Sequence, residues 1–73
     1  MKYIHSNPNI MGGELVVVST RIPIDQVLFM LQEGQSVEEI HAAYPWVPKE
    51  TLQGAIREVL SEALSVLAAK HHA

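Results

Sequence analysis

Residues 36–56, which read SVEEIHAAYPWVPKETLQGAI, decide the fold of this 73-residue chain. Ser36 followed by Glu39 forms a capping box, in which each side chain accepts a backbone N–H from the other residue at the start of a helix. The Tyr-Pro pair at residues 44–45 ends that helix, because proline forces the residue before it out of the α region. A second helix begins near Pro48. The stretch therefore predicts two helices joined by a tight turn, the outline of a helix-turn-helix.

An additional helix is predicted before this pair, over residues 24–32. Pro23 suits the first turn of a helix, where its missing N–H is not needed. Gly34 suits the left-handed position that commonly ends one. The helix has an apolar stripe at the spacing i, i+3, i+4 and i+7, which is typical of a core-facing surface; it consists of Ile24, Val27, Leu28 and Leu31.

The N-terminal residues predict a short β-ribbon over residues 1–19. Residues 2–5 alternate between polar and apolar, and residues 14–19 are rich in β-branched side chains, while residues 6–9 and the Gly-Gly pair at 12–13 indicate turns. Residues 15–18 are apolar on both faces of the second strand, so we expect the ribbon to pack on the helices or on a second subunit. Leu15 and Val17 are its candidate interface residues.

The last helix is predicted to continue to about residue 69. Its length would be about 33 Å at 1.5 Å per residue, more than two short helices can cover. Leu60, Leu64 and Leu67 are then surplus to a three-helix core, and an uncovered apolar stripe indicates an interface. We expect one domain that forms a homodimer, with a ribbon arm (1–19), a helical core (23–58) and a helix extension (59–73).

The composition limits the classes of function. The chain has no cysteine, which excludes disulfides and cysteine-based metal sites, and a domain this small usually needs some other support, such as a partner. Its net charge is −3 with only five lysines and arginines, so a single copy should bind nucleic acid weakly. No leader or membrane-spanning run is visible, and we expect a cytoplasmic protein.

Four residues are candidates for DNA binding. Lys49, Gln53 and Arg57 lie four residues apart on one face of the last helix, and the second helix of a helix-turn-helix enters the major groove of DNA. Gln can pair with adenine, and Lys or Arg with guanine or phosphate. The alternative is an ordinary solvated face. Arg21 could reach a phosphate or a partner's carboxylate, or it could fix the strand-to-helix junction within the chain.

The remaining chemistry-bearing residues predict no catalytic or metal site. Trp46 and Tyr44 are expected to plug the open end of the helix pair, with an interaction hot spot as the alternative for Trp46. The four histidines, and the acids near them, lack the spacing of metal ligands. No nucleophile set, phosphate loop or dinucleotide fingerprint is present, so we expect neither a cofactor nor an enzyme. The histidines are His5, His41, His71 and His72.

Several motifs in order resemble a known family. They are Gly-Gly at 12–13, Ser-Thr-Arg-Ile-Pro-Ile at 19–24, Gly-Gln-Ser-Val-Glu-Glu-Ile at 34–40 and Tyr-Pro at 44–45. This combination is similar to the small bacterial proteins called domain of unknown function 433, and the resemblance covers roughly residues 4–59. It implies a homeodomain-like helix-turn-helix, and it implies antitoxin-like partnership with PIN-like ribonuclease toxins.

Two positions depart from the family pattern. Ser19 stands where the family usually has glycine, and a glycine there would reach a backbone conformation that serine reaches only at a cost. Pro48 stands where the family often has a capping Thr or Ser, so the start of the last helix should shift by about a residue.

The expected fold is mainly α: a homeodomain-like three-helix helix-turn-helix with a short N-terminal β-ribbon and a long C-terminal helix. The expected function is that of an antitoxin-type regulator. It would dimerise, bind a PIN-like nuclease toxin and repress its own promoter by binding a double-stranded DNA operator. The alternative is a protein-interaction or dimerisation module with no nucleic-acid binding.

Overall fold

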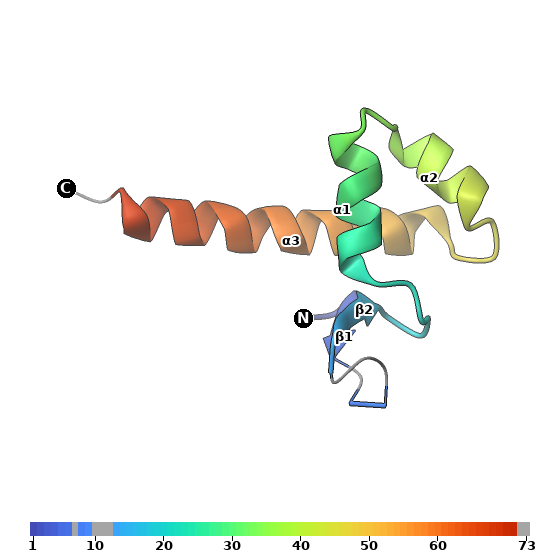
Figure 1. The fold of residues 1–73 in the computed structure, drawn as a ribbon, viewed down its shortest axis with the longest axis horizontal. Helices are drawn as coiled ribbons and strands as arrows, with labels where there is room; N and C mark the ends of the chain where they lie inside the picture. The colour runs from blue at the N-terminus through green and yellow to red at the C-terminus, as the bar shows by residue number, and fades with distance from the viewer. Residues whose placement is uncertain (7, 10–12, 72–73) are drawn as a thin grey trace.

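The computed structural model describes residues 1–6, 8–9 and 13–71, and over these residues the chain is mainly helical. A two-stranded ribbon is followed by three helices (Figure 1). The elements are β1 (Ile4–Ser6), β2 (Leu15–Val17), α1 (Ile24–Gln32), α2 (Val37–Ala43) and α3 (Lys49–Lys70). The ribbon, α1 and α2 gather around the first half of α3, and the second half extends away from them. The predicted ribbon, three helices and long last helix are confirmed.

Helix α1 begins and ends where the sequence predicts. It starts directly after Pro23, which is its N-cap. At its end Gly34 has a φ of +88°, and its N–H donates to the carbonyl of Leu31 at 2.9 Å. The N–H of Gln35 donates to the carbonyl of Met30 at 3.0 Å, which completes a Schellman motif.

The two helices of the opening stretch are also confirmed. The Ser36 Oγ accepts the N–H of Glu39 at 3.1 Å, and the Glu39 carboxylate accepts the N–H of Ser36 at 2.9 Å. Tyr44 is the C-cap of α2. Pro48 is the N-cap of α3 and makes no side-chain cap hydrogen bond, so the helix begins at Lys49.

The ribbon is antiparallel and shorter than predicted. Ile4 lies opposite Val17, and β2 ends there because residues 18–19 form a turn. The Val17 N–H donates to the carbonyl of Ile22 at 2.9 Å, which ties β2 to the junction before α1. Asn7 of the predicted first turn and Gly12 of the Gly-Gly pair lie outside the described residues.

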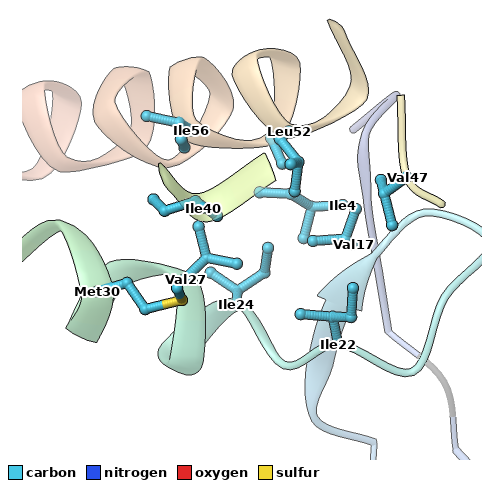
Figure 2. Packing of buried hydrophobic residues seen from close by; sticks show 11 residues of the cluster. Ile4, Val17, Ile22, Ile24, Val27, Met30, Ile40, Val47, Leu52 and Ile56 are labelled. Atoms are coloured by element: carbon cyan, nitrogen blue, oxygen red, sulfur yellow. The ribbon is translucent and has the colours of Figure 1, made fainter. Parts of the chain in front are cut away.

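One apolar core joins the ribbon to all three helices, as Figure 2 shows. Its most completely buried side chains are Ile40, Leu52, Val17 and Val27. The prediction that Val17 belongs to an interface is therefore wrong, because this side chain is 0% exposed and packs inside its own chain. A strand that is apolar on both faces does not reveal which side the helices cover.

The long helix α3 combines a buried half with an exposed half. Leu52, Ala55 and Ile56 are buried, whereas residues 60–71 are all exposed. Within the described residues, no helix is both long enough and apolar enough to span a membrane.

Candidate interaction surface on helix α3

The N-terminal segment is fixed onto α3 by a polar clasp. The N–H of Tyr3 donates to both carboxylate oxygens of Glu58, at 2.6 and 3.0 Å. The Tyr3 ring lies against Gly54, where an added Cβ would overlap the ring. The sequence carried one signal of this contact, because Gly54 stands alone inside a helical pattern, where glycine costs about 1 kcal/mol relative to alanine.

A groove of about 470 Å³ runs along this contact. Its charged residues balance, because Lys2 and Arg57 face the same space as Glu50 and Glu58. Neighbouring carboxylates oppose the approach of a phosphate. The remaining lining residues are Met1, Tyr3, Gln53 and Gly54.

The structure brings together two of the four predicted DNA-binding residues. Gln53 is half-buried and Arg57 is exposed, and both line the groove beside the N-terminal segment. Lys49 is turned toward α2, where its Nζ lies 3.4 Å from a carboxylate oxygen of Glu38. Arg21 lies apart from them, in a second groove of about 580 Å³ beside the ribbon.

Of the two alternatives for Arg21, the one in which it fixes the strand-to-helix junction within the chain is wrong. Arg21 is exposed and makes no hydrogen bond or ion pair with any residue that the structure describes. The junction is fixed by Thr20, whose Oγ1 donates to the carbonyl of Val17 at 2.7 Å and accepts the N–H of Ile22 at 3.0 Å. This pattern of a threonine bonding to nearby backbone was not predicted, although threonine is common in such turns.

The expectation that Trp46 plugs the helix pair is also wrong. Its side chain is 69% exposed and touches the Tyr44 ring edge-on, with the ring centroids 5.8 Å apart. Of these two aromatic residues, only Tyr44 packs against the core. Trp46 is one of the residues that line a small groove of about 310 Å³ between the β2–α1 turn and the start of α3.

The second half of α3 carries the largest group of exposed apolar side chains in the described chain. Leu60 is 54% exposed, Leu64 is 68% exposed and Leu67 is 51% exposed, and Val66 adds to them. The prediction that these leucines are surplus to the core is confirmed. Leu15, the other predicted interface residue, is 49% exposed on the ribbon.

The three leucines continue a row that begins with Gln53 and Arg57. The spacing along this row is four, three, four and three residues, the heptad spacing that keeps side chains on one side of a helix. We call this row the α3 seam: Gln53, Arg57, Leu60, Leu64 and Leu67. It is polar beside the folded body and apolar beyond it. The polar part and the apolar part of the seam therefore lie on the same side of α3.

His5 lies on β1 and His41 on α2. Within the described residues, no group of three or more His, Cys, Asp or Glu side chains could hold a metal ion.

The comparison with family models identifies the domain. The model described as "Protein of unknown function (DUF433)" matches residues 4–58. The chain belongs to this family. The DUF433 match takes in the ribbon, α1, α2 and the first half of α3, and the exposed leucines of α3 lie beyond the matched residues. No curated protein and no solved structure gives a significant match.

Proposed function

We propose that this DUF433 protein is a protein-binding regulator of the antitoxin type, acting in the cytoplasm, and that the second half of α3 is its binding element. The observation that carries the proposal is the row of leucines at positions 60, 64 and 67, each at least half exposed on a helix held by a folded body. Contiguous exposed apolar surface on a small protein commonly marks a binding site.

The charges around α3 favour a protein over DNA as its main ligand. Lys49 is paired with Glu38, and Arg57 shares its groove with Glu50 and Glu58. The whole chain carries a net charge of −3. A DNA duplex would therefore meet repulsion as well as attraction on this side of the helix.

The antitoxin type follows from the family resemblance, which implies a PIN-like ribonuclease as partner. An amphipathic helix that projects from a folded domain can lay its apolar side in a groove of another protein. The lengths and order of α1, α2 and α3 fit a homeodomain-like helix-turn-helix, which we propose as the type of the body. The body would then serve to present the helix.

Co-expression with a candidate PIN-like nuclease tests the proposal. We expect the nuclease to co-purify with the wild-type protein and with Ser65→Glu, which places a charge on the polar side of α3. Leu64→Glu should lose the nuclease, while circular dichroism shows the body still folded. Equal co-purification with Leu64→Glu, or none with the wild type, would contradict the proposal.

DNA binding by α3 is the second candidate, because Gln53 and the exposed Arg57 lie together on its accessible side. If Arg57 contacts a phosphate, Arg57→Ala should weaken binding to promoter DNA. It should also reduce the slope of log affinity against log salt by about 1. Fluorescence anisotropy at several salt concentrations measures both quantities. An unchanged slope, or no salt-dependent binding by the wild type, would remove this candidate.

A further inference from the structure

We infer that the α3 seam pairs with the same seam of a second copy of this chain, with the two helices antiparallel. The inference rests on the proposed function, since it takes the second half of α3 as a binding element. The second copy would bury the same leucines that the nuclease is proposed to bind, so the two partners would compete for them. In the paired arrangement Leu60 of each copy lies beside Leu64 of the other.

The seam is complementary to itself in this register. Its spacing of four and three residues is that of helices that pack side by side in a coiled coil. With Leu60 set against Leu64 of the second copy, Arg57 falls beside Leu67 of that copy and Gln53 beside its His71. All three leucines of each copy then lie against the other helix.

The charges on the seam decide between the two orientations. Arg57 is its one charged residue. Parallel helices would set Arg57 against Arg57 of the second copy, and like charges directly opposed destabilise a pair. Antiparallel helices set Arg57 near the last turns of the other α3, whose terminal carbonyls form the negative end of that helix dipole. The antiparallel pair is therefore favoured.

The folded body leaves room for this pairing. Leu52 and Ala55, which hold α3 to the core, lie on a different side of the helix from the seam, and the buried Ile56 lies at the edge of the seam. The groove beside Arg57 is also lined by Met1, which is 62% exposed. That groove adjoins the place where the last turn of the second copy would lie, so the two copies can also meet there.

The pairing has a consequence for nucleic-acid binding. The second helix would cover Gln53 and Arg57, the two candidate base-contacting residues that the structure brings together. Self-association and DNA contact by these residues would then exclude each other. A dimer of this kind presents protein surface and no recognition helix.

The lack of cysteine in this chain makes a clean test available. Gln53→Cys and His71→Cys are prepared as single variants, one of them with a tag that changes its mass. They are treated with a short bismaleimide, alone and mixed. We expect cross-linked pairs to form mainly in the mixed sample, because positions 53 and 71 meet only between antiparallel copies. Ser65→Cys, on the polar side of α3, should cross-link little.

Cross-linking of Gln53→Cys with itself, at the expense of the mixed pair, would mean a parallel pair and would overturn the inference. Equal yields in all samples, or a wild-type chain that stays monomeric, would overturn it as well. A monomer that still binds the nuclease through Leu64 would leave the proposed function standing. A dimer with the expected cross-links that ignores the nuclease would contradict the antitoxin role alone.

Discussion

Ser19 lies in the left-handed region of backbone conformation, with a φ of +60°. A side chain costs energy in that region, and the family resemblance places a glycine at this position. The turn keeps this geometry because Thr20 bonds to the backbone on both sides of it. The strain at Ser19 could be predicted from the absence of the family's glycine, whereas the hydrogen bonds of Thr20 could be identified only from the structure.

Ser19→Gly should raise the free energy of unfolding by about 0.5–1 kcal/mol, because glycine adopts this φ without strain. Part of the stabilisation is offset because glycine also gives the unfolded chain more conformational freedom. Urea denaturation followed by circular dichroism measures the change. Gln26→Gly, at an exposed position of α1, should lower stability by a similar amount. A destabilising Ser19→Gly would contradict this explanation of the turn.

Gly54 is the second residue whose identity depends on a contact. Gly54→Ala should destabilise the protein by about 1 kcal/mol, since overpacking against the Tyr3 ring outweighs the better helix propensity of alanine. In a Tyr3→Ala background the same change should stabilise by about 1 kcal/mol, because only the propensity remains. Denaturation of the four proteins gives both values. A change of the same sign in both backgrounds would show that the ring is not the cause.

At the level of the elements, the helices were predictable because their signals are local. The capping box, the Tyr-Pro stop and Gly34 each act within four or five residues. The clasp between Tyr3 and Glu58 joins residues 55 positions apart, and no local pattern reports such a contact. The same limit hid the burial of Val17 and the exposure of Trp46, which depend on how separate elements meet.

The capping box of α2 makes stability depend on pH. Two hydrogen bonds from Ser36 hold the pKa of Glu39 below its ordinary value. The bond from the Ser36 N–H has the larger effect, and the bond from its hydroxyl has the smaller one. A lowered pKa in the folded state stabilises the fold above the unfolded-state pKa, and this stabilisation is lost as the pH falls through the folded-state pKa.

Glu39→Gln removes this titration, so the variant should be less stable than the wild type at pH 7. The difference should shrink as the pH is lowered through and below the carboxylate range. Thermal denaturation at a series of pH values measures it. A difference that stays constant with pH would mean that the ionised carboxylate does not carry the cap.

At the level of the whole molecule, the leucines in the second half of α3 remain at least half exposed within their own chain. Burying six half-exposed leucines in a pair would contribute about 6–9 kcal/mol. That gain is of the same order as the cost of association. Self-association should therefore be weak and depend on concentration. It should strengthen in sulfate, which favours apolar burial, whereas DNA binding weakens with salt.

Sedimentation velocity tests the role of α3 most directly. The protein concentration should run from about 10 μM to about 1 mM, a span that suits a dissociation constant of about a micromolar or weaker. We predict that the wild type and Ser65→Glu shift from monomer toward dimer as concentration rises, because only the apolar side of α3 is buried in the pair. Leu64→Glu should stay monomeric with its helices intact. A wild type that is monomeric throughout, or a Leu64→Glu variant that associates as well as the wild type, would contradict the central claim that this row of leucines pairs two copies of the chain.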